Sequence, residues 1–327
     1  MSGKTLEEFL EEAEKSPDPA AYINHLDKES FSRHVLCSLL LIPTDYKADN
    51  LMVDEAYRII GIDNDQALES LEIKKKKNSG RHEVRAKNIL YTLPLMMDPI
   101  AEPVRKKIQQ LMPGLLLLNW LVDLKGHENR DVFFIEAGLL NTSDLTRLKE
   151  QAQDSLELPL KFVPGWLSQM HQRFMMMQQL LSNPTLTHQE LFNHLHPFAS
   201  RYYASLATRY PLPLDQIASL YQTWGPEWDF ETLIEEDPHA SDDELLQTLE
   251  HSSFLGQPAT LTLEQTMKEL IATTNLHHYS VAQQLEWLER IADLGVWPDQ
   301  LHSSWNDPQL LFNMIREGAS DKAIRVL

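Results

Sequence analysis

Four polar residues lie at a spacing that suits phosphoryl transfer from ATP. Asp45, Lys47 and Asn50 stand in one short segment, and Asp63 follows thirteen residues after Asn50. Phosphoryl transfer needs a carboxylate that orients the attacking hydroxyl, a cation beside the transferred group, and oxygen ligands that hold magnesium against the phosphates. These residue types supply all three, so the segment predicts an ATP- and Mg²⁺-dependent site.

A β-hairpin is the element expected to bring the two ends of this segment together. Residues 51–53 and 57–62 are short, apolar and rich in β-branched side chains, with a polar turn between them. The two ends of a hairpin are adjacent. The hairpin therefore predicts that the loop 45–50 lies beside Asp63.

Most of the remaining chain has helical periodicity. Apolar residues recur at helical spacing in residues 31–40, before Pro43, and in residues 166–181. Capping boxes pair a Ser or Thr with a Glu or Gln three residues later, and they predict helix starts at 187–190, 241–244 and 262–265. The sequence thus predicts a mainly α protein with one small β-hairpin.

The charge of the chain is strongly acidic and unevenly distributed. Lys and Arg number 29 against 48 Asp and Glu, a net charge of −19, which argues against broad nucleic-acid binding. Residues 210–267 contain twelve acids and no Lys or Arg. Such a run is typical of a solvated face, with a dedicated binding surface as the alternative.

One segment has the opposite charge. Residues 72–87, here called the basic segment, hold seven Lys or Arg and two Glu around the loop signal Asn-Ser-Gly at 78–80. A basic loop attracts phosphates, and a solvated loop without a ligand is the alternative. The candidate phosphate-binding residues are Lys74, Lys75, Lys76, Lys77 and Arg81.

Other features limit where the protein works. The single cysteine, Cys37, excludes an intramolecular disulfide and favours a reducing compartment. The longest apolar run, residues 114–122, is far shorter than the roughly 20 residues of a membrane span. The first residues lack the apolar core of a signal peptide. We therefore expect a cytoplasmic location.

The loop resembles the catalytic loop of the kinase superfamily. Asp45-Tyr-Lys-Ala-Asp-Asn50 is similar to Asp-Leu-Lys-x-x-Asn of protein kinases and to Asp-Arg-His-x-x-Asn of phosphatidylinositol kinases. Ile60-Gly-Ile-Asp63 resembles the His-Ile-Asp of the latter. With the helix starting at Phe31, these motifs are also similar to phosphatidylinositol-kinase-like effectors that intracellular bacteria secrete, some of them joined to ankyrin repeats. The resemblance covers roughly residues 30–95.

This resemblance implies a role for each motif. Asp45 would be the catalytic base, Lys47 the phosphate-facing cation, and Asn50 and Asp63 the magnesium ligands. The basic segment follows Asp63 where lipid kinases keep the activation loop that contacts the inositol phosphate headgroup. The implied substrate is an inositol phospholipid, with peripheral membrane contact, or else a host protein. Secretion into a host cell would occur without a cleaved signal peptide.

Three departures from the family pattern bear on activity. Asn64-Asp65 replaces the Phe-Gly that follows the metal Asp, and Thr44 stands where protein kinases keep Arg. Only 44 residues precede Asp45, and Gly3 is the only glycine before Gly61, so a glycine-rich phosphate loop is absent upstream. We expect either the C-lobe part of a longer protein or a degenerate kinase.

Two domains are expected on this basis. Residues 1–209 would form a kinase C-lobe-like catalytic region with an absent or truncated N-lobe. Residues 210–327 would form an acidic helical region, in which residues 310–327 resemble the start of an ankyrin repeat. The alternative function is a catalytically inactive pseudokinase or a helical interaction scaffold.

Overall fold

A computed structural model shows two units, each formed by two separate stretches of the chain. Unit 1 comprises Met1–Gln110 and Arg173–Leu255, and unit 2 comprises Leu111–Gln172 and Gly256–Leu327. This division differs from the predicted boundary at residue 210. The residues that the structure describes are 3–43, 45–62, 73–75, 82–84, 86–136, 164–209, 261–295, 303–306, 310, 316, 319 and 320.

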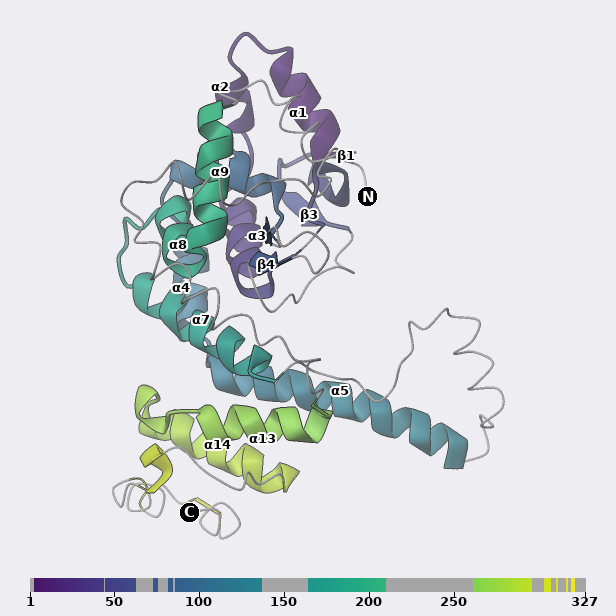
Figure 1. Ribbon diagram of the computed structural model, residues 1–327, viewed down its shortest axis with the longest axis vertical. Helices are drawn as coiled ribbons and strands as arrows, with labels where there is room; N and C mark the ends of the chain where they lie inside the picture. The colour runs from purple at the N-terminus through teal and green to yellow at the C-terminus, as the bar shows by residue number, and fades with distance from the viewer. Residues whose placement is uncertain are drawn as a thin grey trace. The chain divides into compact units, whose positions relative to one another are not determined.

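The protein is mainly helical, as predicted (Figure 1). The helices are α1 (Leu6–Glu14), α2 (Pro19–Ile23), α3 (Lys28–Leu41), α4 (Glu102–Gln110), α5 (Pro113–Glu136), α7 (Trp166–Leu180), α8 (His188–Leu195), α9 (Pro197–Arg209), α13 (Leu263–Thr273) and α14 (Val281–Leu294). Short 3-10 helices are η1 (Ala48–Asn50), η2 (Ile89–Thr92), η3 (Pro94–Met97), η4 (Leu276–His278) and η5 (Ser303–Asn306).

Two small antiparallel sheets accompany the helices. The predicted hairpin is confirmed as β2 (Leu51–Asp54) and β3 (Ile59–Gly61), and β1 (Gly3–Thr5) adds an unpredicted third strand in the order β1-β2-β3. A second pair joins β4 (Ile73–Lys75) to β5 (His82–Val84). The basic segment is therefore not simply a loop, because these two strands pair on either side of residues 76–81.

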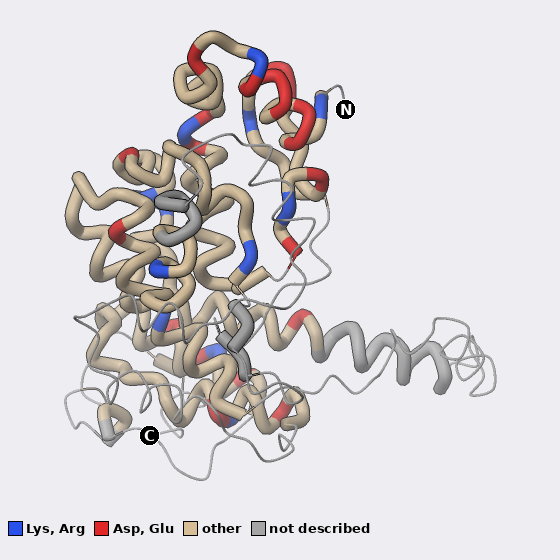
Figure 2. The backbone as a smooth tube through the Cα atoms, turned by 45° about the horizontal axis from the view of Figure 1, so that its top comes forward, with Lys and Arg blue, Asp and Glu red and all other residues tan. Residues whose placement is uncertain are grey.

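Helix α1 follows β1 and covers part of the unit 1 core. Thr5 caps the helix, since its side chain accepts the N–H of Glu8 in a complete capping box. Leu6, Phe9, Leu10 and Ala13 lie at helical spacing and are buried. Glu8, Glu11 and Glu12 are exposed. The acidic residues of α1 form the red segment near the N-terminus in Figure 2. The helix is thus amphipathic, with one apolar face packed on the core.

Helix α3 lies at the centre of unit 1, between the three-stranded sheet and α8 (Figure 1). Asp27 caps its start, and its predicted apolar face is buried. The helix ends at Ile42, which adopts a left-handed conformation with φ 44° and is followed by Pro43. Pro43 opens the loop that carries the candidate site. The core around α3 includes Phe31, Val35, Leu36, Leu39, Leu51, Val53, Ile59, Leu90, Leu191 and Phe192.

Unit 2 has a core of its own. Its main elements are α5, the first part of α7, α13 and α14, and its largest fully buried side chain is Trp287. The predicted capping boxes at Thr187 and Thr262 are confirmed, whereas residues 241–244 lie outside the described part of the chain. Among the described residues, none of the helices is long and apolar enough to cross a membrane.

Candidate functional site

The loop that links α3 to β2 brings Asp45 and Asn50 together. The side-chain nitrogen Nδ2 of Asn50 donates to the backbone oxygen of Asp45 at 2.7 Å and lies 3.5 Å from its carboxylate Oδ2. The single turn η1 produces this closure, because it folds the chain back just before β2 begins. The amide nitrogen is engaged with Asp45, so the amide oxygen of Asn50 is the atom that a cation would bind.

Lys47 lies between two carboxylates. Its Nζ is 3.7 Å from Oδ2 of Asp45 and 3.6 Å from Oδ2 of Asp49, and all three side chains are partly exposed. Exposed ion pairs of this kind contribute only about 0–1 kcal/mol. Lys47 can therefore exchange a carboxylate for a phosphate at little cost. The sequence reasoning did not single out Asp49, which stands within the motif at a variable position.

The hairpin joins this loop to the exit of β3. Leu51 pairs with Gly61, and the N–H of Ile62 donates to the backbone oxygen of Asn50 at 3.1 Å. Ile62 is the last described residue before Asp63, which lies outside the described residues. The predicted closeness of loop and hairpin exit is thus confirmed up to Ile62. The role of Asp63 stays a prediction.

The end of the basic segment also contacts the loop. The N–H of Lys87 donates to the oxygen of Pro43 at 2.8 Å, and Tyr46 exchanges backbone hydrogen bonds with Lys87 at 3.2 Å and Ile89 at 2.9 Å. Ile62 and Lys87, which flank residues 63–86 in the sequence, therefore both bond to the loop. Lys74 and Lys75 lie on β4, where only the backbone is described, and Lys76, Lys77 and Arg81 lie outside the described residues.

Behind the loop, Asn88 is fully buried and is hydrogen-bonded through both its side chain and its backbone. Its side chain donates to the hydroxyl of Ser38 at 2.7 Å and accepts the N–H of Leu90 at 2.9 Å, while its own N–H donates to the hydroxyl of Tyr203 at 3.0 Å. Asn88 forms an isolated parallel bridge with Tyr46. The network therefore fixes the strand-like segment on which the loop rests. Sequence reasoning missed it, because its partners are far apart in the chain.

Two histidines of unit 1, His188 and His196, are buried in the core. His188 donates from Nδ1 to the oxygen of Asp98 at 2.9 Å, and its Nε2 lies 2.8 Å from the Ser32 hydroxyl. His196 binds the oxygen of Leu39 through Nε2 at 2.6 Å. Burial lowers the pKa of His188 to about 4 and that of His196 to about 3, so both rings are neutral near pH 7.

Metal binding by side chains of the described residues alone is not indicated. Within those ranges, no three His, Cys, Asp or Glu side chains gather closely enough to hold a metal ion. Asn50 would supply one ligand of a coordination shell, and Asp63 was predicted to supply another beside the phosphate oxygens.

Comparisons of the chain with protein-family models, curated proteins and solved structures gave no match. The function is therefore argued from the residues and distances of the loop, the hairpin and the segment 86–91.

Proposed function

We propose that the protein is an ATP- and Mg²⁺-dependent phosphotransferase of the phosphatidylinositol-kinase type. Asp45 acts as the base that orients the attacking hydroxyl, and Lys47 neutralises charge on the transferred phosphoryl group. Asn50 and Asp63 hold Mg²⁺ against the phosphates. The order of a buried helix, this loop and a hairpin also fits the C-lobe of the kinase superfamily.

The observation that carries this proposal is the position of Asn50. Its side chain is bonded to Asp45, and its backbone oxygen is bonded to Ile62, directly before Asp63. A metal site for phosphoryl transfer needs its ligands on rigid elements that hold them at fixed separations. The hairpin between Asn50 and Ile62 is such an element, and it supports the assignment of both ligands.

The proposed substrate is an inositol phospholipid. Ile62 and Lys87 both bond to the loop, and the charges at Lys74–Lys77 and Arg81 lie between these two residues in the sequence. Cations attract the phosphates of a headgroup at a membrane surface. Peripheral membrane contact follows from this substrate, and a host protein is the alternative substrate that an assay can distinguish.

The decisive test compares two aspartates that share one lysine. Asp45→Asn removes the proposed base, and we expect phosphoryl transfer to fall roughly a thousandfold, within the range for general bases. Asp49→Asn is the matched control, because Asp49 pairs with the same Lys47, whereas the side chain of Asn50 bonds to Asp45. The measurement is transfer of labelled phosphate from Mg-ATP to vesicles of phosphatidylcholine and phosphatidylinositol. Equal rates for the two variants would contradict the role of Asp45.

Binding of the nucleotide is tested separately from catalysis. Mg-ATP should raise the melting temperature of the wild-type protein, and Asp63→Ala should abolish the Mg²⁺-dependent part of this shift. A wild-type protein without any shift would refute the kinase assignment. The protein would then be an interaction scaffold, in which unit 2 provides a separate helical core that carries none of the proposed site residues.

A further inference from the structure

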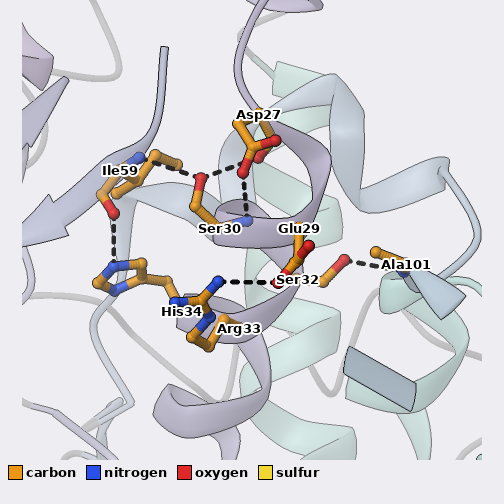
Figure 3. A network of polar contacts seen from close by, with 8 residues as sticks. All are labelled: Asp27, Glu29, Ser30, Ser32, Arg33, His34, Ile59 and Ala101. Atoms are coloured by element: carbon orange, nitrogen blue, oxygen red, sulfur yellow. Dashed lines mark hydrogen bonds and ion pairs between the residues drawn. The ribbon is translucent and has the colours of Figure 1, made fainter. Parts of the chain in front are cut away.

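Strand β3 is an edge of the three-stranded sheet, and α3 satisfies its backbone at Ile59. The N–H of Ile59 donates to the hydroxyl of Ser30 at 3.0 Å, and its oxygen lies 3.0 Å from Nε2 of His34 (Figure 3). Ser30 and His34 are four residues apart, so both lie on the same face of α3. The helix thus provides the donor and the acceptor that a neighbouring strand would otherwise supply.

The second ring nitrogen of His34 contacts the candidate loop. Nδ1 lies 2.5 Å from the hydroxyl oxygen of Tyr46. A carbonyl oxygen can only accept a hydrogen bond, so Nε2 carries the proton that binds Ile59, and Nδ1 of the neutral ring accepts from Tyr46. Burial lowers the pKa of His34, which favours this neutral form. Two directional hydrogen bonds therefore connect the loop, α3 and β3.

Tyr46 is the residue between Asp45 and Lys47. Its backbone is bonded to Lys87 and Ile89 on one side, and its side chain is bonded to His34 on the other. The neighbouring ion pair of Arg33 and Glu29 is exposed and remains within α3 (Figure 3). His34, by contrast, contacts Ile59 through Nε2, as Figure 3 shows, and Tyr46 of the loop through Nδ1.

We propose that His34 is a positioning residue, which acts through Tyr46 to hold Asp45 and Asn50 at a fixed place relative to β3 and the hairpin exit. The effect of His34 on catalysis rests on the proposed function, whereas the contact between His34 and Tyr46 does not depend on it. Movement of the loop by about 1 Å can reduce a rate by two orders of magnitude when reacting groups must be aligned. His34 was not recognised from the sequence, because its partners are twelve and twenty-five residues away.

The first experiment tests the contact between His34 and Tyr46 without an enzymatic assay. Tyr46→Phe removes only the hydroxyl, and Tyr91→Phe is the matched control, because the Tyr91 hydroxyl also bonds to α3, at Ser38, 2.9 Å away. Amides of residues 46 and 50 should exchange hydrogen at least tenfold faster in Tyr46→Phe and at the wild-type rate in Tyr91→Phe. Nitrogen NMR of the wild type should show His34 neutral and protonated on Nε2. A proton on Nδ1, or equal exchange in both variants, would overturn the inference.

A second variant separates the two bonds of the ring. In His34→Gln the side-chain amide can still donate to Ile59 from the Nε2 position, but an acceptor for Tyr46 at the Nδ1 position is lost. Loop exchange in His34→Gln should therefore match that in Tyr46→Phe, and the double variant should be no faster than either single one. Additive effects would mean that the two residues act independently, against the proposal.

Measurements of phosphoryl transfer then test whether the contact between His34 and Tyr46 affects catalysis. With Mg-ATP and phosphatidylinositol vesicles, Tyr46→Phe should lower kcat at least tenfold and change KM for ATP less than twofold, while Tyr91→Phe retains the wild-type kcat. An unchanged kcat in Tyr46→Phe would refute positioning even if the loop exchanges faster. A wild-type protein without Mg-ATP binding would refute the proposed function, and the exchange and NMR results would still decide whether His34 holds the loop.

Discussion

The two units differ in what their buried hydrogen bonds hold in place. In unit 1, buried polar side chains bind partners distant in the chain: Ser32 with His188, His196 with Leu39, and Asn88 with Ser38. Unit 2 also has a distant pair, His171 with Tyr279, but the fully buried hydroxyls of Thr266 and Thr274 bind oxygens four residues earlier, at 2.9 and 2.7 Å. The bonds of Asn88 thus hold the segment that bridges to the candidate loop, whereas these threonines only complete local turns.

This difference indicates what each unit is built for. Apolar packing tolerates small displacements, but hydrogen bonds between distant elements fix both distance and orientation. A site that must hold a base and metal ligands within a fraction of an ångström benefits from the second kind of support. Unit 1 has such bonds beside the candidate loop, whereas in unit 2 they hold a helical core that contains none of the proposed site residues. The contrast leads to three predictions.

Acid should distinguish the units most strongly. His188 and His196 in unit 1 and His171 in unit 2 are buried with lowered pKa values, to about 4, about 3 and about 4. The unfolded chain binds protons near pH 6.5, where the folded chain does not, so stability is lost as pH falls from 6.5 toward these values. In this pH window, each of these histidines lowers the free energy of unfolding by about 1.4 kcal/mol for each unit that the pH falls. Unit 1 should thus lose stability more steeply than unit 2.

Hydrogen-exchange mass spectrometry in urea, repeated from pH 6.5 to 4.5, measures how the stability of each unit changes with pH. Helices α3 and α8 report on unit 1, and α13 and α14 report on unit 2. His188→Asn keeps a donor for Asp98 but cannot ionise, so it should reduce the slope of unit 1 alone. His194→Asn makes the same substitution at an exposed position of the same helix and is the control for the exchange of side chains itself. The prediction is wrong if the stability of both units changes equally with pH, or if His188→Asn does not alter the pH dependence of unit 1.

Removing one buried side chain from each unit should give a smaller but clear difference. Asn88→Ala deletes the amide that binds Ser38 and Leu90, and it should cost about 3 kcal/mol because two buried partners lose their bonds. Thr274→Val removes a hydroxyl that binds only its own helix, and about 1 kcal/mol is expected. Urea denaturation followed by exchange in each unit gives both values. Equal losses would show that long-range bonds give unit 1 no special rigidity.

The same contrast explains which features the sequence could predict. The capping boxes at Thr187 and Thr262 and the strands of the hairpin depend on neighbouring residues, so their local patterns were sufficient. The closeness of Asp45 and Asn50 also follows from a short loop. Strand β1 was missed because three residues carry no alternation, and its pairing with β2 is what makes it a strand.

The supports of the site could not be predicted in this way. His34 and Asn88 bind partners that only the tertiary fold brings near, and a single histidine or asparagine in an apolar stretch has no local signal. The basic segment was predicted as a loop because its charges and its Asn-Ser-Gly outweigh β propensity. Pairing of Ile73 with Val84 nevertheless forms β4 and β5.

The smallest expected effect concerns two helix ends that use the same backbone conformation. Gly295 ends α14 with φ 65°, and Ile42 ends α3 with φ 44°; the N–H of each donates at 3.0 Å to the oxygen four residues earlier. A left-handed residue with a Cβ costs roughly 1–2 kcal/mol. Ile42 is tolerated because it is 1% exposed, and burial of such a side chain contributes about 1.5–3 kcal/mol.

The usual order of alanine and glycine should therefore be reversed at Ile42. Ile42→Ala loses the buried side chain and keeps the strain, whereas Ile42→Gly loses the side chain but relieves the strain, so the glycine variant should be more stable by about 1 kcal/mol. Gly295→Ala should lower the free energy of unfolding by a similar amount, because alanine is strained at this positive φ. Nothing lies within 4 Å of the added Cβ, so a steric clash adds nothing to this cost. Urea denaturation of the three variants measures this. If Ile42→Ala is the more stable variant, Ile42 is unstrained, and the end of α3 stores no conformational energy next to the loop of Asp45.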